Sequence, residues 1–343
     1  MYRLAIVPKI KKRVEYTSAF GSHLDYKHIY KCLSIETFNK NIECKVLNET
    51  QFFKINKEFD GVLFIGTSSR AQEFISTNTN INIFAWGCFI HTANNTPESL
   101  NNVDIVFEQS TNKYDKNKFP NSKVVFLPTG FQDYSEQPIK KYNPKYDIVF
   151  NGTLYRNRRE KTKKYRVEIL EGLLKKGLSV LNINGRAKTD TERKLLEPLK
   201  KYSNFHLLPK FGTIKHYHFG KYSLDLPFLD TMTDNLEQYF GLSLPEIENG
   251  IWLNHWDIFR AIGAKANIIT FDSPEVRNLG LNDENASFYK SSLDDISNLI
   301  EEISSIARKG NLKFIDYKVW SSNTYQSRWS QIITEIEEII NKN

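Results

Sequence analysis

YDIVFNGTLYRNRREK, residues 146–161, joins a short apolar run to a glycine turn and a group of arginines. The run Tyr146–Gly152 predicts a buried strand, and the charged sequence beyond it predicts a helix. The strand ends in Asn151, Gly152 and Thr153. A glycine there lets the backbone approach a phosphate, and the N-terminus of the following helix favours negative charge. The stretch therefore predicts a parallel, doubly wound domain with an anion site at the turn.

Three arginines follow this turn, at positions 156, 158 and 159. Their planar guanidinium groups donate paired hydrogen bonds that suit a diphosphate. The alternative is a plain strand–turn–helix whose arginines are solvated.

Two further motifs lie downstream. The strand Leu178–Gly185 runs into Asn184, Gly185 and Arg186, at a place where a doubly wound domain often holds part of a nucleotide. A plain glycine turn is the alternative. In the helix predicted from Trp256 to Ala264, Asp257 and Arg260 are spaced i, i+3 on one face. They suit ribose hydroxyls and phosphate respectively, or form a surface ion pair.

Short Val-, Ile- and Phe-rich runs alternate with helical patterns along the whole chain, which is typical of parallel βαβ units. The strands predicted in the first half are Arg3–Val7, Glu43–Leu47, Gly61–Gly66, Ile81–Trp86, Asp104–Glu108 and Lys123–Pro128. Those in the second half are Tyr146–Gly152, Leu178–Gly185, Asn204–Leu208, Gly250–Asn254 and Ala266–Asp272, with GKYSLDLPF, residues 220–228, in a loop. Amphipathic helices are predicted over ISNLIEEISSIA and over Tyr325–Ile340.

The predicted fold class is α/β, with two Rossmann-like doubly wound domains facing a cleft. The proline-punctuated stretch Pro128–Pro144 is the expected linker. We therefore expect an N-terminal domain over residues 1–135, a C-terminal domain over 145–320, and a terminal helix over 321–343. Ligands of such folds bind at the carboxyl ends of the strands.

Composition narrows the class of protein. The chain has 343 residues, 40% of them hydrophobic, which is enough for two cores. No apolar run reaches the roughly 20 residues of a membrane span, and we expect a cytoplasmic protein. The net charge of +7 favours anionic partners such as nucleotide phosphates, an anionic membrane contacted peripherally, or nucleic acid. The three cysteines lack metal-ligand spacing, so we expect buried free thiols.

Taken in order, the motifs resemble a known family. DIVFNGTLYRNR, NINGR, DIFRAIGAKANIITFDSPEV, NASFYKSSLDDISNLIEEI and NTYQSRWSQII are similar to the C-terminal half of GT-B glycosyltransferases. The similarity covers roughly residues 146–333 and is strongest to the bacterial spore-maturation type. It is more distant to the bacteriophage DNA β-glucosyltransferases.

The resemblance implies a nucleotide-sugar donor, UDP-linked, bound by the C-terminal domain without metal or cofactor. It also implies an acceptor bound by the N-terminal domain and a last helix that crosses back onto that domain. The expected donor-binding residues are Gly152, Thr153, Arg156, Arg159, Gly185, Arg186, Asp257 and Arg260.

The chain also departs from this family. Where many members have a glutamate followed five residues later by a glycine, this sequence has Arg260 and Lys265, and Asp257 is the candidate substitute. Trp252 stands where retaining enzymes have their other glutamate, which favours inversion. An inverting enzyme needs one general base. The candidates, in order, are His23, Asp25 and His91, in loops after strands of the first domain.

Three histidines, His206, His216 and His218, fall in FHLLPKFGTIKHYHFGKYSLDLPF. No carboxylate or cysteine completes a metal site with them, and a loop near the donor sugar is expected instead. The sequence also lacks an Asp-x-Asp pair at a strand end, which disfavours a metal-dependent GT-A enzyme.

Four functions remain open at this point. The first is glycosylation of a bacterial surface glycan or a lipid-linked glycan. The second is a phage-type enzyme that glycosylates hydroxymethylated bases in DNA. The third is a sugar-nucleotide epimerase. The fourth is a non-catalytic protein that binds a nucleotide sugar, which the arginine at position 260 favours.

Overall fold

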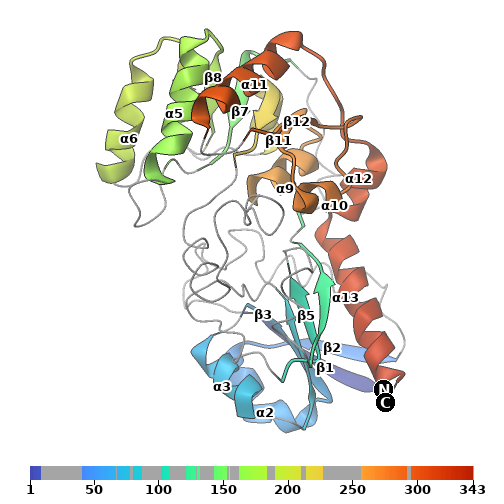
Figure 1. The fold of residues 1–343 in the computed structure, drawn as a ribbon. Helices are drawn as coiled ribbons and strands as arrows, with labels where there is room; N and C mark the ends of the chain where they lie inside the picture. Colours follow the sequence, from blue (N-terminus) through green and yellow to red (C-terminus); the bar gives the residue numbers. More distant parts are fainter. Residues whose placement is uncertain are drawn as a thin grey trace. The chain divides into compact units, whose positions relative to one another are not determined.

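The structure is a computed structural model that describes residues 1–8, 41–66, 68–77, 80–86, 102–108, 121–128, 130–131, 143–152, 154, 162–183, 190–209, 214–226, 256–291 and 295–342. The chain divides into two compact units. Unit 1 consists mainly of Met1–Gln132 and Thr324–Asn343, and unit 2 mainly of Asp133–Asp234 and Leu244–Asn323. Figure 1 shows the elements of both.

Unit 1 contains a parallel six-stranded sheet in the order β2-β1-β3-β4-β5-β6. The strands are β1 (Tyr2–Pro8), β2 (Ile42–Val46), β3 (Gly61–Ile65), β4 (Asn82–Trp86), β5 (Ile105–Glu108) and β6 (Lys123–Phe126). All six were predicted from the sequence. Every residue of β3 is buried, as expected for a parallel strand covered on both faces.

The core of unit 1 is rich in aromatic side chains. Its first helices are α2 (Glu49–Ile55), which begins with a capping box, η2 (Asn56–Glu58) and α3 (Ser69–Thr77). Phe52 of α2 is fully buried, and its ring lies 5.8 Å from that of Phe64 and 5.4 Å from that of Phe74. These edge-to-face contacts fix the two helices against the sheet.

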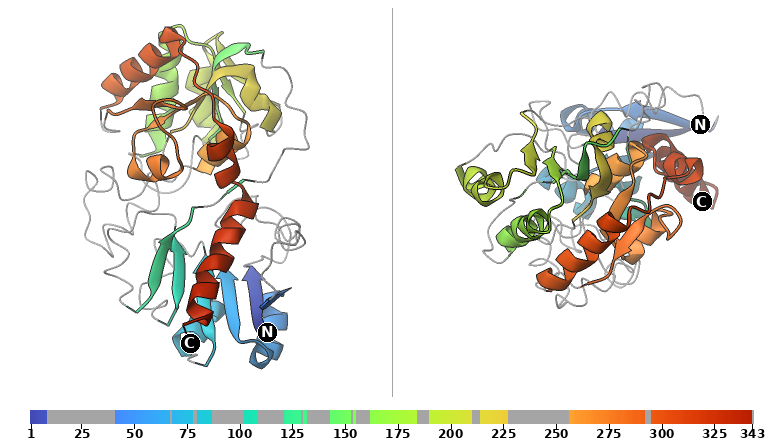
Figure 2. Two further views of the ribbon diagram at one scale, coloured as in Figure 1. Left: turned by 90° about the vertical axis from the view of Figure 1, so that its right-hand side faces the viewer. Right: turned by 90° about the horizontal axis from the view of Figure 1, so that it is seen from above.

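The last helix, α13 (Tyr325–Ile340), belongs to unit 1. Thr324 caps it, and the amide of Tyr325 donates to the carbonyl of Phe131. At its other end, Lys123 forms ion pairs with Glu335 and Glu338. Figure 2 shows this helix alongside the strands of unit 1.

Unit 2 contains a second parallel six-stranded sheet, in the order β12-β11-β10-β7-β8-β9. Its strands are β7 (Tyr146–Phe150), β8 (Val180–Asn182), β9 (Phe205–Leu207), β10 (Gly220–Leu224), β11 (Ile268–Phe271) and β12 (Ser287–Tyr289). Its helices are α5 (Thr162–Lys175), α6 (Asp190–Lys200), η4 (Ile214–Phe219), α9 (Trp256–Gly263), α10 (Pro274–Asn278), α11 (Ile296–Lys309) and α12 (Tyr317–Ser322). The predicted fold class, two Rossmann-like α/β domains, is thereby confirmed.

The sequence prediction was wrong about β10, whose residues were assigned to a loop. This segment has no aliphatic run, because Lys221 and Ser223 alternate with Tyr222 and Leu224. Gly220 fits because a Cβ there would lie 2.8 Å from the backbone nitrogen of Val149 in the neighbouring strand. The strand β12 was also not predicted, and the predicted strand Gly250–Asn254 lies outside the described residues.

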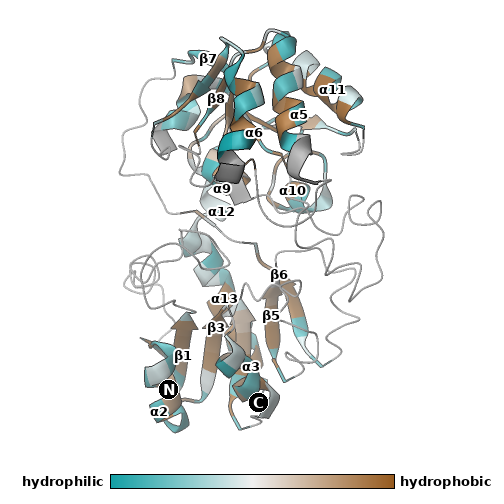
Figure 3. Cartoon of the chain, turned by 90° about the vertical axis from the view of Figure 1, so that its left-hand side faces the viewer, coloured by the Kyte–Doolittle hydropathy of each residue, from teal (hydrophilic) through white to brown (hydrophobic). Residues whose placement is uncertain are grey.

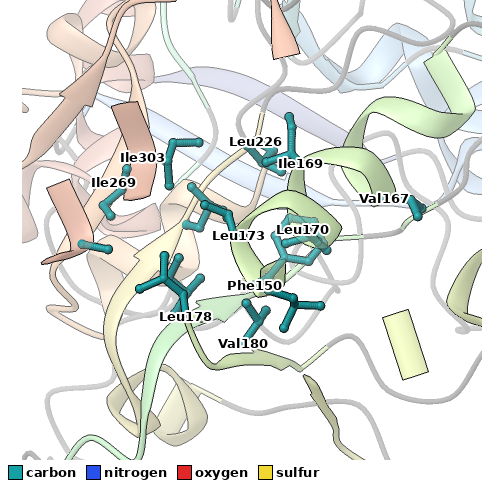
Figure 4. Packing of buried hydrophobic residues seen from close by; sticks show 14 of the residues in the cluster. Phe150, Val167, Ile169, Leu170, Leu173, Leu178, Val180, Leu226, Ile269 and Ile303 are labelled. Atoms are coloured by element: carbon teal, nitrogen blue, oxygen red, sulfur yellow. The ribbon is translucent and has the colours of Figure 1, made fainter. Parts of the chain in front are cut away.

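The core of unit 2 lies between the sheet and the helices α5 and α11. Figure 4 shows Leu170 and Leu173 of α5 and Ile303 of α11 among residues from the strands, including Phe150 and Ile269. Gly172 allows the two helices to approach, because a Cβ there would lie 2.2 Å from Cδ1 of Ile300.

Hydropathy follows this architecture. Figure 3 shows hydrophobic strands in both sheets and helices with one hydrophilic face. No helix in the part of the chain that the structure describes is long and apolar enough to cross a membrane.

Candidate functional site

The strand order of unit 2 reverses between β7 and β10. From β7 the chain adds β8 and β9 on one side, and β10, β11 and β12 follow on the other. Phe150 and Leu224, the last residues of β7 and β10, are partners in register. The two turns that follow therefore start side by side. Doubly wound folds bind their ligands at such a reversal, outside the carboxyl ends of the strands.

A buried hydrogen bond supports the turn after β7. Nδ2 of Asn151 donates to the hydroxyl of Tyr217, and both side chains are buried. Tyr217 lies in η4, which contacts β7, β10 and α9. The turn predicted from the sequence is therefore tied to an element more than sixty residues later.

Gly152 lies against a buried arginine. A Cβ at Gly152 would be 2.6 Å from Cζ of Phe150 and 2.9 Å from Nη1 of Arg166. Arg166, in α5, is buried, and its Nη2 donates to the carbonyl of Leu226, two residues beyond β10. Its guanidinium also lies 5.7 Å from the ring centroid of Phe150. Arg166 thus connects the two turns at the reversal.

Asp225, the residue after β10, is hydrogen-bonded to the strands β11 and β12. Its buried carboxylate accepts a hydrogen bond from the hydroxyl of Thr270 at 2.8 Å. Its carbonyl accepts another from the hydroxyl of Tyr289 at 2.8 Å. Since these partners lie in β11 and β12, Asp225 fixes the carboxyl ends of three strands relative to one another.

The helix α9 carries the third motif. The structure describes the backbone of Asp257 but not its side chain, so its predicted role toward ribose and the alternative ion pair with Arg260 both stay open. Arg260 is half-buried. Lys265, which occupies the family's glycine position, has φ of +52°, in the left-handed region that favours glycine. Its ammonium group lies 4.9 Å from the ring centroid of Trp320 and 5.8 Å from that of Tyr317.

The three histidines do not converge. The ring of His206 on β9 lies 4.7 Å from that of Tyr146, whereas His216 and His218 are in η4. Burial lowers the pKa of His218, and its hydrogen bond with the backbone of Ala264 opposes this shift. Among the described residues, no group of three or more His, Cys, Asp or Glu could hold a metal ion.

Of the three cysteines, only Cys44 is described. It is a half-buried free thiol in β2, and burial raises its pKa to about 12. Cys32 and Cys88 lie outside the described residues.

Several predicted site residues also lie outside the described ranges. They are Thr153, Arg156, Arg159, Gly185 and Arg186 of the donor set, and the base candidates His23, Asp25 and His91. Conversely, sequence reasoning missed Arg166, Tyr217 and Asp225. Only Arg166 left a signal, because it falls on the same helical face as Leu170 and Leu173, among apolar residues.

No family model matches the chain, and no curated protein matches its sequence. Its structure resembles that of the pneumococcal O-GlcNAc transferase GtfA in complex with UDP and GlcNAc (TM-score 0.53, 14% identity), over 83% of this chain and 59% of GtfA. It also resembles the sucrose-phosphate synthase of Thermosynechococcus elongatus (TM-score 0.58, 10% identity), over 100% and 99% of the two chains.

A third similar structure is that of the lipopolysaccharide outer core galactosyltransferase WaaB (TM-score 0.57, 11% identity), over 97% of this chain and 99% of WaaB. Likeness at such identities shows the fold, which is the GT-B fold of glycosyltransferases. A specific likeness to the spore-maturation or phage enzymes is not among these matches.

Proposed function

We propose that this chain is a glycosyltransferase that moves a sugar from a UDP-linked donor to a hydroxyl group of a bacterial surface glycan or a related acceptor. The turn at Asn151–Gly152, at the strand reversal of unit 2, carries the proposal. Such a reversal is where doubly wound sheets bind their ligands. Further support comes from GtfA, which binds UDP and GlcNAc, and from WaaB, a galactosyltransferase.

The donor is assigned to unit 2. The diphosphate would lie at the turns after β7 and β8, where backbone amides and guanidinium groups favour negative charge. The residues proposed for this role are Gly152, Thr153, Arg156, Arg159, Gly185 and Arg186. On α9, Asp257 would accept the ribose hydroxyls and Arg260 would reach a phosphate.

The acceptor is assigned to unit 1, and the transfer inverts the sugar's anomeric centre. One general base then takes the proton of the attacking hydroxyl. His23 is the first candidate, followed by Asp25 and His91, because each lies in a segment that follows a strand of that sheet.

Thermal-shift measurements over a panel of nucleotide sugars test the donor assignment. A ligand present at about 100 times its Kd stabilises the protein by about 2.7 kcal/mol. Arg156→Ala should weaken donor binding by about 1.5–3 kcal/mol, the value of a lost charge-assisted contact. Arg193→Ala, which removes an exposed arginine from α6, is the matched control. Equal donor affinity in wild type and Arg156→Ala would refute the phosphate assignment.

A second candidate function is donor binding without catalysis. It is favoured by Arg260, since α9 carries an arginine where many GT-B enzymes have a glutamate. Incubation of the bound donor with glycan, lipid-linked and hydroxymethylated DNA acceptors separates the two functions. Transfer to any of them, with an inverted linkage by NMR, supports catalysis. Donor binding with no transfer to any acceptor supports the second candidate.

A further inference from the structure

We propose that Arg166 is a positioning residue for the donor diphosphate, an inference that rests on the proposed function. Its side chain is only 4% exposed, although it belongs to the most strongly hydrated class of residues. A buried guanidinium is costly unless it is hydrogen-bonded, and Arg166 donates to the carbonyl of Leu226. This buried guanidinium lies at the strand reversal, next to the proposed donor site, and not in a remote part of the core.

The contacts of Arg166 join the two segments that border the proposed site. Arg166 is a residue of α5. Its guanidinium lies near the ring of Phe150, at the end of β7, and donates to the carbonyl of Leu226 in the turn after β10. Phe150 and Leu224 are register partners, so Arg166 braces the two turns just beyond the last paired residues of the central strands. Removal of this brace would let the turn that carries Gly152 move relative to β10.

The position of Arg166 requires a residue without a side chain at position 152. The φ of Gly152 is not positive, so glycine is not required there by the backbone conformation. Space is the reason instead, because a Cβ would lie 2.9 Å from Nη1 of Arg166 and 2.6 Å from Cζ of Phe150. The glycine thus serves two purposes at once. It leaves the turn's backbone open to a phosphate and leaves room for the neighbouring guanidinium.

The position of the charge adds an electrostatic role. A positive charge beside the turn favours a diphosphate bound at the turn, and salt screens a buried charge much less than an exposed one. Arg166 should therefore affect the affinity for diphosphates and not for an uncharged nucleoside. The contribution of Arg166 to diphosphate affinity should also persist at high salt, whereas the contribution of a surface arginine should weaken.

Calorimetric titration of the full chain with UDP, inorganic pyrophosphate and uridine tests the proposal. The variants are Arg166→Met and Arg166→Lys, with Arg193→Ala as the control. Arg166→Met should weaken UDP and pyrophosphate binding by roughly tenfold or more at both 0.1 M and 0.5 M salt, and leave uridine binding unchanged. Arg166→Lys, which keeps the charge but loses the fork, should fall between wild type and Arg166→Met.

A loss that is equal for all three ligands would mean a merely structural role and overturn the proposal, as would unchanged affinity. If Arg166→Met does not fold, Arg166→Lys and Gly152→Ala replace it, and both should weaken pyrophosphate more than uridine. If Arg166→Met binds pyrophosphate more weakly than wild type does, but wild type transfers no sugar, only the proposed function is refuted. Wild type that binds neither UDP nor pyrophosphate would refute both.

Discussion

The two sheets have the same parallel plan but bury different side chains. In unit 1 the described strands are covered by aliphatic and aromatic groups, with Phe52 at the centre of one cluster. In unit 2 the carboxyl ends of the strands bury Asn151, Asp225 and Thr270, together with Arg166 beside them. Within the described ranges, every buried polar or charged residue except Thr324 and Arg328 belongs to unit 2.

Buried polar groups lower stability unless they are hydrogen-bonded, so they are buried where the fold supplies partners for them. Unit 2 holds three of them, Asn151, Arg166 and Asp225, at the strand reversal, where a ligand would use the geometry that they fix. The polar groups at the strand reversal therefore favour the proposal that the donor binds in unit 2.

The largest expected effect concerns the base assigned to unit 1. His23→Ala should lower kcat by about 10²–10⁴-fold, because the acceptor hydroxyl loses its general base. Donor affinity should not change, since the donor is assigned to the other unit. Steady-state kinetics at saturating donor, repeated for Asp25→Ala and His91→Ala, checks this. Near-normal turnover in all three folded variants would place the base elsewhere.

The core of unit 1 supplies the next prediction. Phe52→Ala should lower the free energy of unfolding by about 3–5 kcal/mol, because it leaves a cavity among several aromatic rings. Phe314→Ala is the control, since Phe314 is 58% exposed and should change stability by less than about 0.5 kcal/mol. Urea denaturation measures both. Equal losses in the two variants would contradict the apolar packing described for unit 1.

A smaller effect is expected for the polar network of unit 2. Thr270→Val removes the hydroxyl that donates to the buried carboxylate of Asp225, and should cost about 1.5–3 kcal/mol. Thr270→Ser keeps the hydroxyl and should retain most of the stability. Denaturation curves of the two variants decide between hydrogen bonding and packing. A valine variant as stable as wild type would mean that this bond contributes nothing.

The smallest effect is on acid stability. The hydrogen bonds and charge of Arg277 hold the pKa of Asp272 below its usual value. This stabilisation is therefore present above the unfolded pKa of about 3.9 and is lost as pH falls through the lower, folded pKa. Asp272→Asn should remove about 1 kcal/mol or less at pH 7, because the pair is partly exposed.

Denaturation between pH 2 and pH 7 should accordingly show a flatter acid limb for Asp272→Asn than for wild type. Glu338→Gln is the comparison in unit 1, where Lys123 also lowers the pKa of the carboxylate. Glu338 is more exposed than Asp272, so its variant should change the acid limb less. The reverse order would contradict the relative strength assigned to the two ion pairs.

Strands with a continuous run of apolar residues, such as GVLFI of β3, were predictable from the sequence. Sequence reasoning failed for β10, because Gly220, Lys221 and Ser223 do not form an aliphatic run. Their place in a strand follows only from packing against the neighbouring strand β7. For the site, the turn at Gly152 was predictable from its local pattern. The contacts of Arg166 and Asp225 were not, since their partners are up to sixty-four residues away in the chain.

Hydrogen exchange of the full chain with and without UDP shows which segments contact the donor. If the donor binds at the strand reversal of unit 2, UDP should slow amide exchange at residues 151–154 and 184–186 and in α9, while β2 and α2 of unit 1 keep their rates. Bound UDP that protects only unit 1, or leaves residues 151–154 unchanged, would contradict a donor site at the strand reversal of unit 2.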